Sequence, residues 1–337
     1  MSNPLISILM AVYNGERYLR EALDSLLAQT YANWQLLCVD DGSTDSSRCI
    51  LKEYSERDSR IVVIESAENQ GAGNARNLGL EKAEGEIIMM LDCDDWLSAD
   101  ALQLLRDAFA ADAEMDTVLL TLRYVELDGE MLDFRNEIKD GISWLSGREA
   151  CLLAINWRIH GVYAARRRLY DSYPYDCISK VYSDDNTTRL HYLHSRKVGF
   201  CNGVYYYRQH PLSSTARKDK VQWDILTALD SLRQSLAGEG LDENALHLVD
   251  LQKWRNVMGG YMYYYARRRY LDEEERAELR AILDRHYFST LTKGLPLSLK
   301  FRFGYAPIKW CPPLYRLQMR IFTRLRLLLG MDKHRYG

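Results

Sequence analysis

Short apolar runs alternate with segments of helical periodicity along the first hundred residues. The runs at 6–12, 34–39, 61–64 and 87–91 have the length and residue types of buried strands. After the first run, apolar residues recur at helical spacing at Leu19, Ala22, Leu23, Leu26 and Leu27. Strand and helix alternate in units of roughly 25–30 residues, which predicts a parallel sheet with helices on its faces. The chain is therefore expected to be an α/β protein.

The pattern continues with a hairpin and a capped helix. Apolar runs at 117–127 and 130–134 flank Asp128-Gly129, a pair typical of a tight β-turn. Ser146 and Glu149 have the spacing of a capping box, in which two side chains satisfy the first amides of a helix. We expect a helix to begin there. Earlier in the chain, Ser43 or Thr44 can cap the helix that continues to about Glu56.

A further helix and strand complete the predicted first domain. The polar run Ser183-Asp184-Asp185-Asn186 precedes helical spacing, and either aspartate is suited to cap that helix. Residues 198–207 are typical of a strand, and residues 221–287 are helical in pattern. We expect three parts: a domain at 1–215, a helical extension at 216–292 and a basic tail at 293–337.

Carboxylates gather where two of the expected strands end. Asp40-Asp41 follows the second strand, and three aspartates at 92–95 follow the fourth. In parallel sheets, ligands bind beyond the carboxyl ends of the strands. Hard cations take oxygen ligands, so we expect Mg²⁺ or Mn²⁺ carrying a phosphorylated ligand at this edge. The alternative is a solvated acidic loop that caps the helix at 100–111.

The number and spacing of the cysteines indicate the cellular compartment of the protein. The 337 residues include seven cysteines, an odd number without a Cys-x-x-Cys pair. This argues against a disulfide framework or a zinc site and favours reduced thiols in the cytoplasm. The run at 5–12 is too short to span a membrane and has no basic residues before it, so we interpret it as a strand.

Charge is distributed unevenly along the chain. The last 45 residues hold ten Lys/Arg and one acid, which leaves 34 basic and 46 acidic residues elsewhere. Within the tail, residues 312–330 place apolar side chains on one helical face, namely Leu314, Leu317, Ile321, Leu325 and Leu328. A basic row occupies another face, namely Arg316, Arg320 and Arg324. Such a helix, beside Phe301, Phe303 and Trp310, is typical of an anionic membrane surface.

Two alternatives to membrane contact remain for the tail. It can dock on the acidic body of the protein, or it can form a dimer contact. Nucleic acid is a poor partner, because the acidic remainder of the chain would repel phosphate. We therefore expect a cytoplasmic protein that associates peripherally with the inner face of the cell membrane.

Six short motifs occur in order along the chain. They are Ala11-Val12-Tyr13-Asn14, Asp40-Asp41-Gly42-Ser43-Thr44-Asp45, Ala75-Arg76-Asn77-x-Gly79, Asp92-Cys93-Asp94-Asp95-Trp96, Asp184-Asp185 and Arg208-Gln209-His210-Pro211. With these motifs, residues 4 to about 215 resemble the family 2 glycosyltransferases of the GT-A fold, of the kind that builds bacterial surface polysaccharides. The resemblance implies a Rossmann-like, mixed but mainly parallel sheet flanked by helices, with a C-terminal helical extension. It also implies a nucleotide-sugar donor and a glycan or lipid-linked acceptor.

Residues that would bind the donor follow from the resemblance. Tyr13 would pack on the nucleobase, and Asp41 would accept a hydrogen bond from its ring N–H. Ala11 would lie at the edge of the base pocket, although proline or threonine is usual there. Arg76 would also contact the donor, and Asp92 would hold the ribose or the metal.

The same resemblance implies the metal ligands and the base. Asp94 and Asp95 would bind the metal, Asp94 with the ribose as an alternative, and His210 would contact the metal or the diphosphate. Asp185 would be the general base, with Asp184 where glutamate is commoner. A base at a helix start is favoured in its ionised form by the helix dipole.

We expect a single in-line displacement, which inverts the anomeric carbon. A double displacement would need a second carboxylate as nucleophile on the opposite face, and the Asp40-Asp41 pair is assigned to the nucleotide. The sugar is most readily a UDP-sugar. Two other functions stay open. A sugar nucleotidyltransferase would need a Gly-rich, Arg-bearing loop after the first strand, where Tyr13-Asn14-Gly15-Glu16 stands. A catalytically silent nucleotide-sugar-binding or scaffold protein would keep the pocket without turnover.

Overall fold

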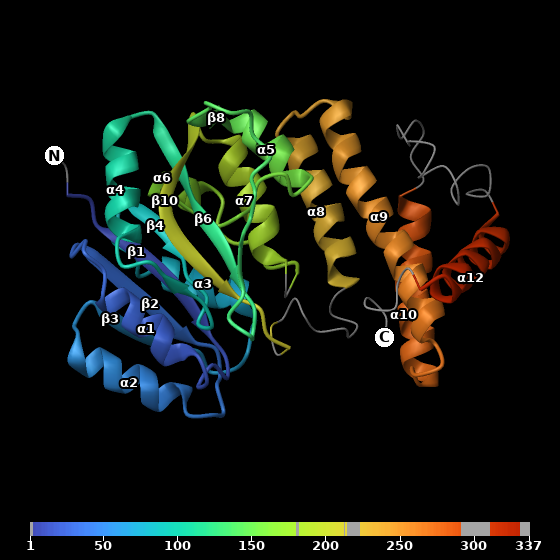
Figure 1. Cartoon of the computed structure of the whole chain (residues 1–337), viewed down its shortest axis with the longest axis horizontal. Coiled ribbons are helices and arrows are strands. Elements are labelled where there is room, and N and C mark those ends of the chain that lie inside the picture. The colour runs from blue at the N-terminus through green and yellow to red at the C-terminus, as the bar shows by residue number, and fades with distance from the viewer. Residues whose placement is uncertain (1–2, 180–181, 212, 214–222, 291–310, 331–337) are drawn as a thin grey trace. The chain divides into compact units, whose positions relative to one another are not determined.

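The computed structural model describes residues 3–179, 182–211, 213, 223–290 and 311–330. The chain forms two compact units, Met1–Arg217 and Lys218–Gly337, which are treated separately below (Figure 1). The first unit ends two residues beyond the expected limit of 215. The boundary expected at 292–293 lies outside the described residues.

The apolar runs of the first unit form one edge of a ten-stranded sheet. Strands β1 (Ile6–Val12), β2 (Trp34–Asp40), β3 (Ile61–Glu65) and β4 (Ile87–Met90) lie in the order β3-β2-β1-β4 and run parallel. Their apolar side chains face helices on both sides, so most residues of β1, β2 and β4 are buried. This part confirms the parallel sheet that the sequence predicts.

The other half of the sheet is mixed. Strand β9 (Tyr163–Arg166) runs antiparallel between β4 and β6 (Met115–Val125), and β10 (Lys197–Arg208) runs parallel to β6. Two reversals of direction therefore leave β10 pointing the same way as β1 and β4. As a result, residues that follow β10 emerge at the same edge of the sheet as residues that follow β4.

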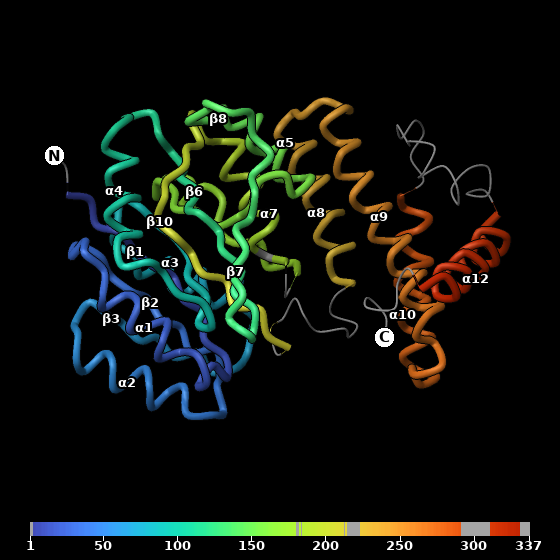
Figure 2. The backbone as a smooth tube through the Cα atoms, viewed as in Figure 1, coloured from blue at the N-terminus to red at the C-terminus, as the bar shows by residue number. Residues whose placement is uncertain are grey.

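Three short strands complete the sheet. Strand β5 (Trp96–Leu97) pairs antiparallel with β10, and β8 (Trp144–Ser146) pairs with the other end of β10. Strand β7 (Met131–Asp133) pairs with β6 (Figure 2). The turn between β6 and β7 contains Gly129 at φ +87°, a conformation that glycine adopts without strain. The hairpin predicted at Asp128-Gly129 is confirmed.

Seven helices pack on this sheet within the described part of the first unit. They are α1 (Leu19–Leu27), α2 (Ser47–Arg57), α3 (Ala72–Leu80), α4 (Ala101–Ala111), α5 (Gly147–Ile155), α6 (Arg167–Ser172) and α7 (Ser183–Leu193). The capping box at the start of α5 is present, with Ser146 and Glu149 bonded to each other's amides. Helix α1 buries the apolar face predicted for it, apart from the half-buried Leu27.

Two predicted helix caps are wrong. Helix α2 begins at Ser47, so Ser43 and Thr44 lie before it and instead bind the loop after β1: the amide of Asn14 donates to Ser43 Oγ, and the amide of Thr44 donates to Asn14 Oδ1. Helix α7 has Tyr182 at its N-cap without a side-chain cap bond, so Asp184 and Asp185 stand inside its first turn. Neither aspartate caps the helix.

The described part of the second unit is helical. It contains α8 (Ile225–Gly238), α9 (Glu243–Arg267), α10 (Glu273–Ser289) and α12 (Pro312–Leu328). Its core is aromatic, and its buried rings are Trp223, Trp254, Tyr261, Tyr263, Tyr287 and Tyr315. The Tyr-rich stretch of α9 at 261–265 therefore contributes in part to packing. Within the described residues, no helix is both long and apolar enough to cross a membrane.

Candidate active site

Strand direction gathers the predicted site residues at one edge of the sheet. Tyr13 follows β1, Asp41 follows β2, the aspartates at 92–95 follow β4 and His210 follows β10. All four strands run the same way, so these residues meet beyond the carboxyl ends of neighbouring strands. The convergence inferred from the acidic clusters is present.

Asp92, Asp94 and Asp95 form a compact carboxylate cluster. One oxygen from each lies within 4.8 Å of the others. Nε2 of His210 lies 2.8 Å from Oδ2 of Asp94, and the imidazole is only 8% exposed. The His210 ring packs against the ring of Tyr18 at 4.9 Å. The sequence interval of 116 residues between Asp94 and His210 closes only because β10 and β4 share a direction.

Asp95 is held from both sides by the protein. The amide of Arg208 donates to Oδ1 and the hydroxyl of Tyr205 donates to Oδ2, both at 2.8 Å. The Tyr205 oxygen also accepts from the amide of Asp92 at 3.1 Å. Tyr205 therefore links the acidic loop to β10. The role of Tyr205 cannot be predicted from the sequence, because a tyrosine in a strand carries no signal of its partners.

Crowding changes the acidity of this cluster. Burial, followed by the charge of Asp92, raises the pKa of Asp94, against the opposing effect of His210. Burial, followed by the charges of Asp94 and Asp92, raises the pKa of Asp95 well above its usual value. A neighbouring positive charge would favour the ionised forms. The electrostatics of the cluster therefore fit a bound cation.

Arg76 supplies one positive charge to this site. Its Nη2 donates to Oδ1 of Asp92 at 2.5 Å, its side chain is nearly buried, and its guanidinium lies 5.4 Å from the ring centre of Tyr175. Burial, together with the charges of Asp185 and Asp92, raises the pKa of Asp184 to about 6 against the opposing charge of Arg76. Arg76 thus lies within electrostatic reach of both the acidic loop and the first turn of α7.

Asp185 has a different environment. Its Oδ1 accepts a hydrogen bond from Nη1 of Arg189 at 2.7 Å, one helical turn along α7. Nη2 of Arg189 donates to the carbonyl of Ala154 on α5 at 3.0 Å. Arg189 therefore fixes the orientation of Asp185 relative to α5, whereas the neighbouring Asp184 interacts with Arg76 and Asp92.

The predicted nucleobase pocket has a rigid floor. Asp41 is 2% exposed and accepts hydrogen bonds from the amides of Gln70 and Gly71 at 2.9 and 2.8 Å. Gly42, next to it, has φ +80°, and a side chain there would meet the amide of Asn69 at 3.1 Å. Both oxygens of Asp41 thus already have protein donors, so a base N–H would share an oxygen with one of them. The ring of Tyr13 is 48% exposed, open for stacking, and Ala11 is half-buried on β1.

The guanidinium of Arg208 is bound by other groups of the protein. Its guanidinium donates to Glu21 Oε2 at 2.5 Å and to the carbonyl of Asp94 at 3.0 Å. It also lies between the rings of Tyr18 and Trp96, at 4.5 and 4.4 Å from their centres. Arg208 therefore anchors the acidic loop to α1, a role that sequence spacing does not reveal.

The donor set suits a hard divalent cation. Carboxylate oxygens with one imidazole nitrogen are ligands that Mn²⁺ and Mg²⁺ accept in proteins. Nδ1 of His210 is buried without a hydrogen-bond partner among the described residues. A bound cation would reduce the repulsion between the clustered carboxylates and would lower the raised pKa values of Asp94 and Asp95. The residues present therefore fit a metal that bridges a phosphorylated ligand.

The mainly parallel sheet, with an Asp-x-Asp loop at the end of its fourth strand, has the GT-A fold that the motifs indicate. The fold resembles S. aureus TarS residues 1–349 in complex with UDP-GlcNAc, with a TM-score of 0.71 and 17% identity over 96% of this chain and 92% of that one. The family described as Glycosyl transferase family 2 matches residues 7–170. The chain thus carries a family 2 glycosyltransferase domain, as its motifs indicate.

Curated relatives match the chain to different extents. Glycosyltransferase GlyG of Streptococcus pneumoniae is 25% identical over 82% of this chain and 93% of its own length. The Escherichia coli protein WfgD, named UDP-Glc:alpha-D-GlcNAc-diphosphoundecaprenol beta-1,3-glucosyltransferase, is 42% identical over 31% of this chain and 40% of its own length. Four other curated glycosyltransferases match segments that cover only 14% to 41% of their own lengths.

Proposed function

We propose that this chain is an inverting, metal-dependent glycosyltransferase that moves a sugar from a UDP-sugar to a glycan or lipid-linked acceptor in surface polysaccharide synthesis. The observation that carries the proposal is the meeting of Asp92, Asp94, Asp95 and His210 beside the strand end that bears Tyr13. This arrangement supports a nucleoside diphosphate with its diphosphate on the acidic loop and its base toward Tyr13.

Asp94 and His210 would hold the cation, with Asp92 beside them. When bound there, a divalent cation would supply Lewis-acid neutralisation of the leaving diphosphate. Asp95 contributes mainly by keeping the loop in place, because Tyr205 and Arg208 occupy its oxygens. Asp92, which is paired with Arg76, would bind a ribose hydroxyl or the cation.

Transfer also requires a carboxylate that accepts the proton of the acceptor hydroxyl as the new bond forms. The first turn of α7 would supply it. The family resemblance assigns the role to Asp185, which Arg189 orients at 2.7 Å. A specific observation favours Asp184 as the second candidate: a pKa of about 6 suits a base that works near neutral pH, and its charge interacts with that of Asp92.

In the proposed reaction, the hydroxyl oxygen of the acceptor attacks the anomeric carbon as the bond to the diphosphate oxygen breaks. The proton passes to the α7 carboxylate, and the electron pair of the broken bond stays with UDP. One displacement inverts the anomeric configuration. Within the described site, Asp41 is held by Gln70 and Gly71 and is not free to act as a covalent nucleophile.

The donor and acceptor classes are supported by relatives. WfgD is named for UDP-glucose and a diphosphoundecaprenol-linked acceptor, and TarS is seen with UDP-GlcNAc. Extended to this chain, these names favour a UDP-sugar and an acceptor that a membrane lipid carries. Helix α12 fits such a setting, because five of its apolar residues are exposed: Leu314, Leu317, Ile321, Leu325 and Leu328. We therefore propose peripheral association with an anionic membrane surface.

The test is a titration of the purified chain with UDP in the presence and absence of Mn²⁺, followed by a release assay across UDP-, GDP- and dTDP-sugars. A glycosyltransferase binds UDP more tightly with Mn²⁺ and releases UDP from one donor when acceptor extract is added. Binding without any turnover would indicate the silent scaffold instead. Release of diphosphate from a nucleoside triphosphate and a sugar phosphate would indicate a nucleotidyltransferase.

A further inference from the structure

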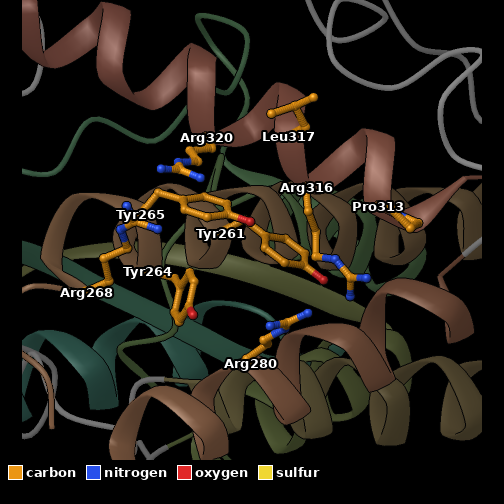
Figure 3. A pocket seen from close by; sticks show the side chains of 9 residues that line it. All are labelled: Tyr261, Tyr264, Tyr265, Arg268, Arg280, Pro313, Arg316, Leu317 and Arg320. Atoms are coloured by element: carbon orange, nitrogen blue, oxygen red, sulfur yellow. The ribbon is translucent and has the colours of Figure 1, made fainter. Parts of the chain in front are cut away.

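A second cleft lies within the C-terminal unit. It has a volume of about 380 Å³ and is lined by residues from α9, the turn after it, α10 and α12. Figure 3 shows the lining side chains, which are Tyr261, Tyr264, Tyr265, Arg268, Arg280, Pro313, Arg316, Leu317 and Arg320. Arginine and tyrosine supply seven of these nine residues. The nucleotide-sugar site makes no use of any of them.

The cleft carries a surplus of positive charge. Four guanidinium groups line it, and no carboxylate is among the lining residues. The nearby Asp284 binds Nη1 of Arg316 at 2.8 Å and lies 3.7 Å from Nε of Arg280. Arg268 and Arg320, by contrast, form no ion pair with any residue that the structure describes. Asp284 therefore partly neutralises Arg316 and Arg280, whereas no described carboxylate neutralises the charges of Arg268 and Arg320.

Tyrosine provides further donors and flat walls. The hydroxyl of Tyr261 donates to Oδ1 of Asp284 at 2.5 Å, which fixes the carboxylate that holds Arg316. The rings of Tyr264 and Tyr265 meet edge to face at 5.1 Å. Burial raises the pKa of Tyr265, so its phenol stays a donor. Guanidinium and phenol groups that converge on one cleft suit a phosphate, whose oxygens accept several charge-assisted hydrogen bonds.

An apolar surface begins at the same cleft. Leu317 lines the cleft and is 51% exposed. It belongs to a row along α12 in which Ile321, Leu325 and Leu328 are 51%, 53% and 83% exposed. The opposite face of α12 packs into the unit through Tyr315 and Met319, both 1% exposed. The helix therefore presents hydrocarbon outward in an orientation that its own packing fixes.

We propose that this cleft seats the phosphate of an anionic phospholipid head group, with the acyl chains of that lipid along the leucine row of α12. A phosphodiester joined to hydrocarbon matches the cleft and the row together, whereas a soluble anion would leave the row exposed to water. The inference rests on the membrane association proposed above and adds to it a defined head-group site. A basic amphipathic helix without a site would respond only to the overall surface charge.

The experiment uses the full chain and short-chain lipids below their micelle concentration, so that no charged surface is present. Dihexanoyl-phosphatidylglycerol, dihexanoyl-phosphatidylcholine and inorganic phosphate are titrated separately by calorimetry. The cleft variant is Arg268→Gln with Arg320→Gln. Its matched control is Arg269→Gln with Arg324→Gln, which removes two exposed charges from the same parts of the unit but outside the cleft lining.

We expect phosphatidylglycerol to bind at least about tenfold more tightly than phosphatidylcholine, because the choline cation of phosphatidylcholine would be repelled by the guanidinium groups of the cleft. We expect the same margin over inorganic phosphate, which has no acyl chains to contact Leu317 and its neighbours. The cleft variant should lose at least tenfold of this affinity, and the control should stay within about twofold. Leu317→Gln should weaken phosphatidylglycerol without changing the affinity for phosphate. UDP binding should be equal in all four proteins.

Three results would overturn the proposal. Inorganic phosphate that binds as tightly as the short-chain lipid would make the cleft a site for a soluble anion. Equal losses of affinity for phosphatidylglycerol in the cleft variant and its control would show that overall positive charge, and not the cleft, binds the lipid. Failure of phosphatidylglycerol to bind the unchanged protein would remove the site altogether. In each case an intact response to UDP and Mn²⁺ would leave the transferase proposal standing, and its loss in the unchanged protein would count against that proposal alone.

Discussion

The link that Tyr205 makes between β10 and the acidic loop yields a sharp prediction. Tyr205→Phe removes one hydroxyl from a ring that is 1% exposed. The change deletes the bond to Asp95 Oδ2 at 2.8 Å and the acceptor for the amide of Asp92 at 3.1 Å. The side chain otherwise keeps its shape, so the packing of the ring is preserved.

The expected cost follows from these two bonds. A hydrogen bond to a charged group contributes about 1.5–3 kcal/mol, and a buried oxygen left without a donor costs about 1–3 kcal/mol. Because the pKa of Asp95 is already raised by burial, loss of the phenol should push this carboxyl further toward its neutral form. We expect the free energy of unfolding to fall by about 2–3 kcal/mol at pH 7.5, measured by urea denaturation.

Tyr205→Phe should also weaken the binding of the nucleotide. The amide of Asp92 and the carboxylate of Asp95 lose their shared anchor, so the affinity for UDP in the presence of Mn²⁺ should fall at least about fivefold in calorimetry. Tyr124→Phe is the control, because the structure gives its hydroxyl no partner among the described residues of the first unit. The control should stay within about 0.5 kcal/mol. If Tyr205→Phe also stays within that range and binds UDP normally, then Tyr205 does not organise the loop.

Three further predictions concern the α7 base and the tail. Asp185→Asn should lower the rate of transfer by about 10²–10⁴-fold, with the affinity for UDP changed only a few-fold. Asp184→Asn, measured in the same assay, identifies which carboxylate is the base, and turnover that survives both changes would contradict a base in α7. The raised pKa of Asp184 means that its contribution to stability is complete below its unfolded value of 3.8 and is lost as pH rises through about 6. Asp184→Asn should therefore stabilise the protein in urea at pH 7.5 by up to about 3 kcal/mol but not at pH 3.5, and an equal effect at both pH values would refute this. Ile321→Gln with Leu325→Gln should release the chain from phosphatidylglycerol vesicles in a flotation assay without lowering its melting temperature, since both side chains are about half exposed; unchanged flotation would exclude the leucine row as the contact.

The sequence predicts much of the fold because its signals there are local. The alternation of apolar runs and helical spacing locates β1 to β4 and their helices, and the Asp-x-Asp loop lies where a strand end was expected. The parallel direction of these strands is enough to bring Asp41 and the 92–95 loop to one edge. The hairpin at Gly129 and the capping box at Ser146 depend on a few neighbouring residues and are likewise readable.

The partners of individual side chains could not be predicted, because they depend on contacts between distant segments. Glu21 and Arg208 are 187 residues apart and join at 2.5 Å only after β10 has been placed in the sheet. The engagement of Asp41 by Gln70 and Gly71 depends on a loop with no helical or strand periodicity. The helix cap predicted at Ser43 is wrong for a related reason. The Ser43 hydroxyl accepts a hydrogen bond from the amide of Asn14, which lies in the loop after β1 and far from Ser43 in the sequence.

We propose above that the carboxylates at this sheet edge bind a divalent cation together with the diphosphate of UDP. The most direct test is the loss of the free Mn²⁺ signal in electron paramagnetic resonance as the chain is titrated, with and without UDP. We expect one Mn²⁺ per chain, bound at least about tenfold more tightly when UDP is present, and loss of this site in Asp94→Asn but not in the exposed Asp107→Asn. Equal UDP affinity in Mn²⁺ and in EDTA, with no change in Asp94→Asn, would contradict it.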